Sequence, residues 1–196
     1  MGKEFELKFA ATPAQQAQIA ALYGPFSEIA METTYYDTKT FDFSAQKMTL
    51  RRRYENGLSV CTLKAPLGAN SRKEFEVEAE DILSAIPMLC KLSGWQELET
   101  LTNHGLIPLC GARFTRQAAT LSLPDCTLEL ALDAGVLTAG ERQIPLCEIE
   151  VELKSGAEEA AVAFARELSG NFHLQPQPKS KFARAMELAF QQTEGR

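Results

Sequence analysis

Acidic and apolar residues alternate in two segments at opposite ends of the chain. Residues 4–8 read Glu-Phe-Glu-Leu-Lys, and residues 147–153 read Cys-Glu-Ile-Glu-Val-Glu-Leu. Because successive side chains of a strand point to opposite faces, each segment predicts a strand with an apolar back and a charged front. Carboxylates without histidine are the ligands that Mg²⁺ and Mn²⁺ prefer. The two fronts therefore indicate a polar cavity that binds divalent cations.

Basic residues follow the same alternation in other predicted strands. Arg51 and Arg53 share one face of a strand, and Lys64 lies on the charged front of the next predicted strand. Lys181 and Arg184 lie at the start of the last predicted helix. Arginine and lysine are the side chains that bind phosphate oxygens, and the N-terminus of a helix attracts anions as well. Further charged residues on such faces are Arg72, Glu74, Glu76, Arg116, Glu129 and Asp133. Together, the acids and bases predict a cavity for a metal-bound polyphosphate.

Each pattern also has an ordinary structural explanation. An isolated Glu-x-Glu-x-Lys segment is usually the solvated face of an edge strand, and Arg51 and Arg53 can pair with acids in a structural network. Three carboxylates on one face repel one another unless a cation or base neutralises them, which favours the metal hypothesis. The two histidines, His104 and His173, are isolated, so a histidine triad or a zinc site is not expected.

Composition narrows the class of protein. A chain of 196 residues suits one domain, and its net charge of −6 argues against binding to nucleic acid or to an anionic membrane. The five cysteines form no Cys-x-x-Cys pair, which is typical of buried thiols in a reducing compartment. No apolar run is long enough to cross a bilayer, and no signal peptide is recognisable. We therefore expect one cytoplasmic domain over residues 1–196.

Helix caps, turn residues and alternating segments along the chain together predict an α+β fold. After the opening strand, Thr12-Pro13 begins a helix that ends at Gly24-Pro25. Strands are expected over residues 28–37, 47–54, 58–64, 72–80, 111–122, 126–133 and 144–153, with turns at Asn56-Gly57 and at 133–135. Helices are expected over residues 81–94, with a kink or restart at Pro87, and over 158–168 and 180–191.

About eight strands with such faces are compatible with a sandwich, an open sheet or a barrel. We favour a closed antiparallel barrel with the helices packed outside, because its charged fronts would face one another around one small ligand.

Residues 4–8 resemble the Glu-x-Glu-x-Lys signature of the CYTH superfamily, the triphosphate tunnel metalloenzymes. The resemblance extends over nearly the whole chain, because further motifs follow in the expected order. They are Tyr35-Tyr36-Asp37-Thr38, Leu50-Arg51-Arg52-Arg53, Thr62-Leu63-Lys64, Arg72-Lys73-Glu74-Phe75-Glu76, Arg116, Leu132-Asp133-x-Gly135, residues 147–152 and Ser180-Lys181-x-x-Arg184. Two positions depart from the family pattern: Arg52 replaces a usually apolar residue, and Lys47 stands where glycine is common.

The resemblance implies an eight-stranded antiparallel tunnel that binds a triphosphate inside. It assigns metal binding to Glu4, Glu6, Asp133, Glu148 and Glu150. It assigns substrate binding to Lys8, Arg51, Arg53, Lys64, Arg72, Arg116, Lys181 and Arg184. It gives catalytic roles to Lys8, Glu76 and Glu150, with Glu76 orienting bases or bridging to a second metal.

The function that the resemblance implies is hydrolysis of inorganic tripolyphosphate to pyrophosphate and phosphate, with Mg²⁺ or Mn²⁺ as cofactor and two ions during turnover. The alternatives are a thiamine or nucleoside triphosphatase, a class IV-type adenylate cyclase, and a non-catalytic polyphosphate-binding module. Residues 132–152 most resemble bacterial inorganic triphosphatases, which often carry a helical CHAD domain, and we expect none within residues 1–196. The expected partner is a small-molecule triphosphate, with no nucleic acid or membrane.

Overall fold

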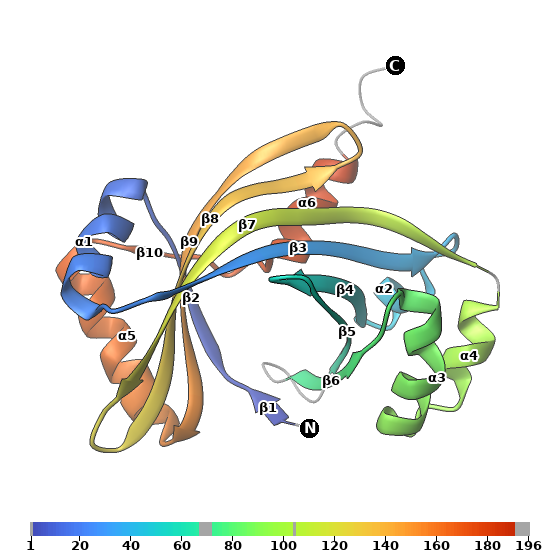
Figure 1. Ribbon diagram of the computed structural model, residues 1–196, viewed down its shortest axis with the longest axis horizontal. Coiled ribbons are helices and arrows are strands. Elements are labelled where there is room, and N and C mark those ends of the chain that lie inside the picture. The colour runs from blue at the N-terminus through green and yellow to red at the C-terminus, as the bar shows by residue number, and fades with distance from the viewer. Residues whose placement is uncertain (1, 67–71, 104, 191–196) are drawn as a thin grey trace.

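The computed structural model describes residues 2–66, 72–103 and 105–190. Over these residues the chain forms one antiparallel sheet of ten strands with helices packed on it (Figure 1). The strands are β1 (Gly2–Glu4), β2 (Glu6–Ala10), β3 (Ser27–Thr38), β4 (Thr49–Glu55), β5 (Leu58–Pro66), β6 (Arg72–Glu78), β7 (Leu106–Ser122), β8 (Cys126–Ala139), β9 (Arg142–Gly156) and β10 (Gln175–Pro176). The helices are α1 (Pro13–Tyr23), α2 (Asp42–Ala45), α3 (Ile82–Ser93), α4 (Glu97–Thr102), α5 (Glu158–Phe172) and α6 (Lys181–Phe190).

The strand order is β1-β6-β5-β4-β3-β7-β8-β9-β2-β10. Within the described residues this order does not return to its start, and it contains ten strands, so the closed eight-stranded barrel is not confirmed. One segment nevertheless lies against both β6 and β9: β1 pairs with β6, β2 pairs with β9, and only Phe5 separates the two strands. The predicted first strand is thus divided into two short strands.

The predicted alternation of charged and apolar residues is confirmed by the register. Arg51 lies opposite Tyr35 and Thr62, Asp133 lies opposite Arg116 and Glu148, and Glu150 lies opposite Lys8. All of these side chains belong to one face of the sheet, which we call the charged face, and the opposite face is the outer face.

Backbone conformation accounts for the β4–β5 hairpin and for the usual preference for glycine at position 47. Asn56 and Gly57 connect the two strands with φ of 50° and 89°, as the Asn-Gly pair predicts. Lys47, which precedes β4, has φ of 57°, a left-handed conformation in which glycine is least strained.

The turn predicted at residues 133–135 is wrong, because β8 runs through it without interruption. Asp133 and Gly135 pair with β7 on one side and with β9 on the other, and this two-sided pairing outweighs the local turn signal. Gly135 is required here for space: a Cβ atom would lie 2.2 Å from the carbonyl oxygen of Arg113 and 2.5 Å from the Cα of Phe114.

The helices begin largely where the sequence predicts. Thr12 caps α1 through a capping box with Gln15. Helix α3 continues through Pro87 without a restart, and Ile86 and Leu89 of the same turn are buried against the sheet. Helix α5 passes through Gly170, beyond its predicted end, and the short helix α4 was not predicted.

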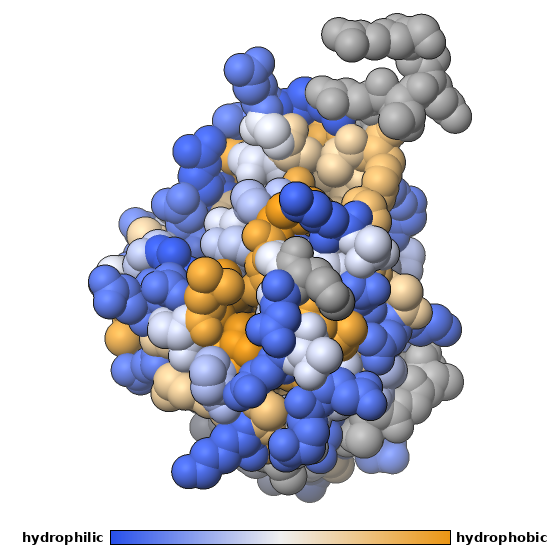
Figure 2. Space-filling view, turned by 90° about the vertical axis from the view of Figure 1, so that its right-hand side faces the viewer, coloured by the Kyte–Doolittle hydropathy of each residue, from blue (hydrophilic) through white to orange (hydrophobic). Residues whose placement is uncertain are grey.

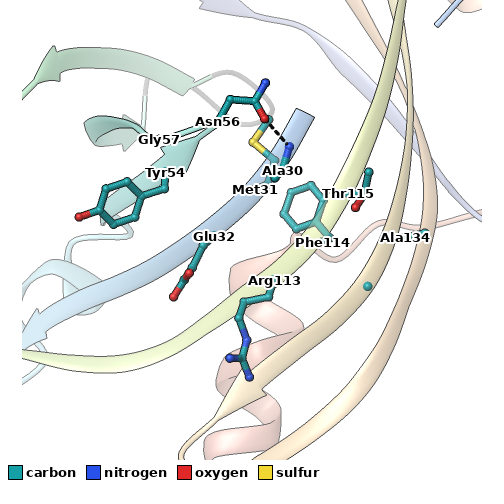
Figure 3. Close-up of a pocket in the computed structure, with 11 residues that line it drawn as sticks. Ala30, Met31, Glu32, Tyr54, Asn56, Gly57, Arg113, Phe114, Thr115 and Ala134 are labelled. Atoms are coloured by element: carbon teal, nitrogen blue, oxygen red, sulfur yellow. Dashed lines mark hydrogen bonds between the residues drawn. The ribbon is translucent and has the colours of Figure 1, made fainter. Parts of the chain in front are cut away.

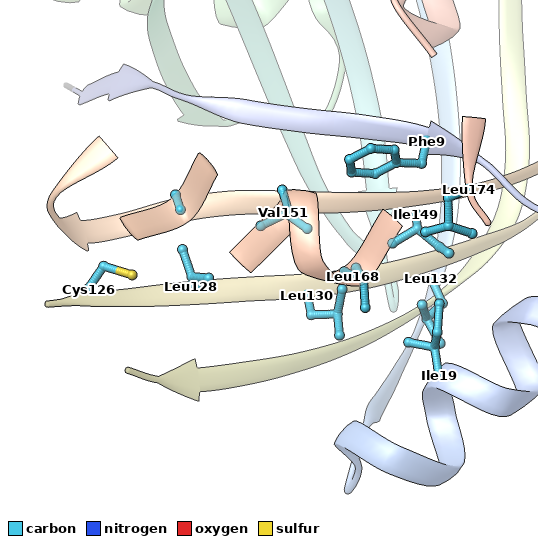
Figure 4. Close-up of a cluster of buried hydrophobic side chains, with 12 residues drawn as sticks. Phe9, Ile19, Cys126, Leu128, Leu130, Leu132, Ile149, Val151, Leu168 and Leu174 are labelled. Atoms are coloured by element: carbon cyan, nitrogen blue, oxygen red, sulfur yellow. The ribbon is translucent and has the colours of Figure 1, made fainter. Parts of the chain in front are cut away.

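The outer face is covered in two places by apolar clusters. One cluster joins β8 and β9 to α1 and α5, and Figure 4 shows Ile19 of α1 beside Leu132 of β8. The second cluster packs α3 and α4 on the sheet around β4, β5 and β6. Figure 2 views the side of the molecule that α3 and α4 form, where Leu83, Met88 and Leu92 of α3 are exposed.

Helix α6 departs from the expectation that the helices pack outside, because it lies on the charged face. Phe182 contacts Tyr35 with ring centroids 5.0 Å apart, and Ala185 and Leu188 are buried in a cluster with Phe114 and Leu146. The apolar stripe of α6 is satisfied by these inward residues, and the helix therefore brings Lys181 and Arg184 to the charged face.

Candidate functional site

Three carboxylates from two neighbouring strands form the centre of the site. Asp133 and Glu148 are fully buried, and Glu150 is 8% exposed. Each offers an oxygen that lies within 4.8 Å of the others, so the three are close enough to bind one cation. We call this group the acid cluster. Its donors are all carboxylate oxygens, which suits Mg²⁺ or Mn²⁺ rather than zinc.

Basic side chains surround the acid cluster. Arg116 donates to both carboxylate oxygens of Asp133, at 2.8 and 2.7 Å, and also contacts Glu150. Lys181 lies 2.7 Å from Asp133 and 2.8 Å from Glu150, and it contacts Glu148 as well. Arg184 pairs with Glu148. Every carboxylate of the cluster is thus held by at least one base, as buried ionised groups require.

The environment shifts the ionisation of these groups. Burial raises the pKa of Glu148, although Lys181 opposes the effect. Burial also opposes ionisation of Glu150, but Lys181 and Arg116 outweigh it and hold its pKa well below the usual range. Lys181 loses solvation by burial, yet its three acidic partners raise its pKa. Two neighbouring carboxyls with pKa values moved in opposite directions are typical of functional sites.

A second charged group lies on β4, β5 and β6. Arg51 and Lys64 each approach the same oxygen of Glu74, at 3.2 Å, and Arg51 lies 3.7 Å from Glu76. Thr62 donates to Glu76 at 3.0 Å. We call Arg51, Arg53, Lys64, Glu74 and Glu76 the base cluster.

Arg53 belongs to this cluster and pairs with Glu55. Its Nε is buried and has no hydrogen-bond partner within the described residues. Burial and the neighbouring charge of Arg51 lower the pKa of Arg53. Two guanidinium groups crowded on one face are suited to an anionic ligand.

The remaining predicted residues are distributed around these clusters. Lys8 pairs with Glu6 at 2.8 Å, next to Glu150 in the register. Glu76 lies in the base cluster with its side chain 44% exposed and does not contact the acid cluster. Arg72, the first residue of β6, donates to the hydroxyl group of Thr49 at 3.3 Å. Glu4 lies opposite Arg72 in the pairing of β1 with β6, and the structure describes only its backbone, so its predicted role in metal binding is outside what is described.

Three residues of the site had been given no metal-binding, substrate-binding or catalytic role from the sequence. Glu74 contacts both Arg51 and Lys64, and the alternation of residues 72–78 already placed it on the charged face. Phe114 lies beneath two bases, with its ring centroid 5.1 Å from Nζ of Lys181 and 6.0 Å from Cζ of Arg116. Tyr35 lies opposite Arg51, and burial raises its pKa. Because residues two apart in a strand share a face, the alternation along β3 and β7 could have placed these two aromatic residues on the charged face.

A cavity of about 480 Å³ lies around the β4–β5 turn and the middle of β3 and β7, and Phe114 is the residue of the site that also lines it. Figure 3 shows Glu32 and Arg113 extending to one side of the strands, with Met31 and Phe114 on the other. None of the residues that line it belongs to the acid or base cluster. Charge and burial, rather than the size of this cavity, therefore locate the candidate site.

Comparison with known proteins identifies the family. The CYTH domain family matches residues 2–186, and the chain belongs to this family. A relative from Haemophilus influenzae, named inorganic triphosphatase, is 32% identical over 165 residues, which cover 80% of this chain. The chain spans about half the length of that relative, since the match covers 46% of it.

Solved structures share the fold at lower identity. The Hippeastrum protein HpAC1, for which a dominant triphosphatase activity is described, has a TM-score of 0.66 and 18% identity, over 95% of this chain and 96% of its own. The PH1819 protein of Pyrococcus horikoshii has a TM-score of 0.64 and 21% identity, over 94% and 99%. Among the described residues, no helix is long and apolar enough to span a membrane.

Proposed function

We propose that this protein hydrolyses inorganic tripolyphosphate to pyrophosphate and phosphate in a metal-dependent reaction. The observation that carries the proposal is the division of the charged face: a buried carboxylate cluster suited to a divalent cation lies on the same face as a cluster of bases suited to phosphate. The name of the Haemophilus influenzae relative supports the same class of reaction.

The proposed site is a tunnel. The segment of residues 2–10 pairs with β6 through β1 and with β9 through β2, so it connects the base cluster side of the sheet to the acid cluster side. Charged fronts that face one another across such a lumen would surround a ligand that is anionic along its whole length.

We assign metal binding to the acid cluster together with Glu6 and Glu4. A bound Mg²⁺ or Mn²⁺ would neutralise phosphate oxygens and acidify a water for in-line attack, and a second ion would serve during turnover. The residues present fit such an ion, because three buried carboxylates converge within 4.8 Å and supply only oxygen ligands.

The protein's own bases would bind and orient the phosphates. Arg116 is fixed by two hydrogen bonds to Asp133, so its guanidinium has a set orientation before a ligand binds. Arg51 and Lys64 approach the same oxygen of Glu74, so the two bases converge on one point of the charged face, as binding of an anionic group requires. Lys8, Arg53, Arg72, Lys181 and Arg184 would complete the substrate contacts. Positioned charge of this kind stabilises the transferred and leaving phosphoryl groups.

The test is a substrate panel of tripolyphosphate, ATP and thiamine triphosphate, each with Mg²⁺ and with Mn²⁺. We expect kcat/KM for tripolyphosphate to exceed that for ATP by several tens-fold or more, since the ribose and adenine of ATP would displace charge-assisted contacts worth about 1.5–3 kcal/mol each. Tyr35 and Phe114 on the charged face are 5% and 8% exposed, so neither offers an open surface for adenine.

Three results would overturn parts of the proposal. An equal or better kcat/KM for ATP would contradict the assignment of substrate, and formation of cyclic AMP would indicate a cyclase. Binding of tripolyphosphate without release of phosphate would indicate a binding module.

A further inference from the structure

Gln16 is a buried polar residue whose partners belong to the acid cluster. It lies on α1, on the outer face of the sheet, and is 9% exposed. Its Nε2 donates to the backbone carbonyl oxygens of Asp133 and Glu148, at 2.9 Å each. These two carbonyls belong to directly opposed residues of β8 and β9. One amide group therefore joins the two strands behind the carboxylates.

The surroundings of Gln16 are apolar. Ile19, one turn further along α1, is fully buried, and Leu132 and Ile149 flank the two carbonyls in the same cluster (Figure 4). Burying an amide among apolar side chains is unfavourable unless it is hydrogen-bonded, and an aliphatic residue would fill this position without that penalty. The two hydrogen bonds of Gln16 thus account for a polar residue at this position.

The geometry allows Gln16 to act on the site through the backbone. The side chains of Asp133 and Glu148 leave the sheet on the charged face, opposite to Gln16. A carbonyl oxygen has two lone pairs, so each can accept from Gln16 in addition to its bond within the sheet. A common donor limits how far the two backbones, and with them the two carboxylates, can separate.

Helix α1 is itself anchored, so that Gln16 has a fixed position. Its neighbour Gln15 accepts from the backbone N–H of Thr12 at 2.8 Å and donates to the carbonyl of Phe172 in α5, also at 2.8 Å. The N-terminus of α1 is therefore attached to α5, and the side chain of Gln16 is presented to the strands from a rigid helix.

We propose that Gln16 is a positioning residue that sets the spacing of the Asp133 and Glu148 carboxylates for binding of a divalent cation. This inference rests on the proposed function, because it assumes that the acid cluster binds the metal. Groups that orient metal ligands from behind typically change metal affinity by 10–100-fold when they are removed.

The experiment measures the affinity of the whole chain for Mn²⁺ alone, by electron paramagnetic resonance of the free ion, without substrate. Gln16→Met keeps the length of the side chain and removes the donor, and we expect the Mn²⁺ affinity to fall about tenfold. The metal concentration for half-maximal hydrolysis should rise in parallel, while kcat at saturating metal should change less than threefold.

Two control variants separate positioning from general stability. Gln18→Met changes an exposed residue of the same helix and should leave the Mn²⁺ affinity unchanged. Ile19→Val removes one methylene from the same buried cluster and should lower Tm by a few degrees without changing the Mn²⁺ affinity.

The outcomes are distinguishable. A weaker affinity confined to Gln16→Met supports the proposal. An affinity equal to that of the native protein, or an equal loss in Ile19→Val, would overturn it while leaving the proposed function intact. Absence of Mn²⁺ binding to the native protein would overturn the metal-dependent function and this inference together.

Discussion

The acid cluster and the base cluster share one face of one sheet, yet they are built differently. In the acid cluster the side chains of Asp133 and Glu148 are fully buried, and Lys181 contacts all three carboxylates. In the base cluster Glu74 and Glu76 have side chains that are 19% and 44% exposed, and their contacts with Arg51 are 3.2 and 3.7 Å long.

This difference indicates that the two clusters have different roles, with the acid cluster suited to a metal ion and the base cluster suited to phosphate. Buried carboxylates cannot remain ionised without cations close by, so the acid cluster must always hold bases or metal. In the base cluster Glu74 and Glu76 are partly solvated and their contacts with Arg51 and Lys64 are longer, so these two bases can exchange a carboxylate for a phosphate at low energetic cost. We therefore expect changes to the acid cluster to abolish turnover and changes to the base cluster to weaken it.

The largest expected effect is that of Glu150→Gln. The substitution keeps the shape of the side chain but removes a charged metal ligand, so hydrolysis of tripolyphosphate should fall by about a hundredfold or more. Steady-state phosphate release measures it. Glu159→Gln, on the exposed surface of α5, is the control and should change turnover little. Similar losses in both variants would show that burial and charge do not identify the site.

Lys181→Ala should have the next largest effect, because it leaves three buried carboxylates with fewer bases. We expect a loss of about 1–3 kcal/mol in kcat/KM and a lower free energy of unfolding, measured by denaturant titration. Lys179→Ala is the matched control, since that side chain is 55% exposed and pairs only with Glu187 among the described residues. An unchanged kcat/KM in Lys181→Ala would remove α6 from the site.

Arg53→Ala should cost less, about 1–2 kcal/mol in kcat/KM, since other bases of the partly solvated base cluster remain. The control is Arg52→Ala, whose side chain lies on the outer face over the ring of Tyr54 at 4.3 Å. A greater loss from Arg52 than from Arg53 would mean that the two faces of β4 are assigned the wrong way round.

The smallest expected effect is the contribution of Glu150, in the acid cluster, to the pH dependence of stability. The pKa of Glu150 is held well below its usual range, because Lys181 and Arg116 outweigh its burial. Below about pH 4.3 the unfolded chain binds a proton at this residue while the native protein does not, so stability falls as pH falls. The contribution of one group to this slope is at most about 1.4 kcal/mol per pH unit.

Urea titrations of the native protein and of Glu150→Gln between pH 3 and pH 5 measure this contribution. The variant should lose stability less steeply toward low pH. Identical slopes would contradict the depressed pKa of Glu150.

Local patterns predicted the faces of the strands well and their contacts poorly. Alternation fixes that Arg51 and Arg53 share a face, because it depends only on neighbouring residues. The contact between Arg116 and Asp133 depends on the pairing of β7 with β8, which no local pattern specifies. The turn expected at residues 133–135 failed for the same reason, since the Asp-x-Gly signal is local and the pairing of β8 is not.

The position of α6 was also beyond local reasoning. Its apolar stripe was visible in the sequence, but a stripe does not state which face of the sheet it covers. Gln16 gave no signal either, since a glutamine in a polar helix start is ordinary until its buried partners are known. Residues that act through tertiary contacts are therefore the ones that the sequence could not identify.

The central claim is that the acid cluster binds a divalent cation that hydrolysis requires. The most direct measurement is phosphate release from tripolyphosphate by the native protein, after EDTA treatment and removal of the chelator, with Mg²⁺ or Mn²⁺ then added back. We predict no turnover in the stripped protein and recovery as either ion is restored. Full turnover after thorough stripping would contradict the account.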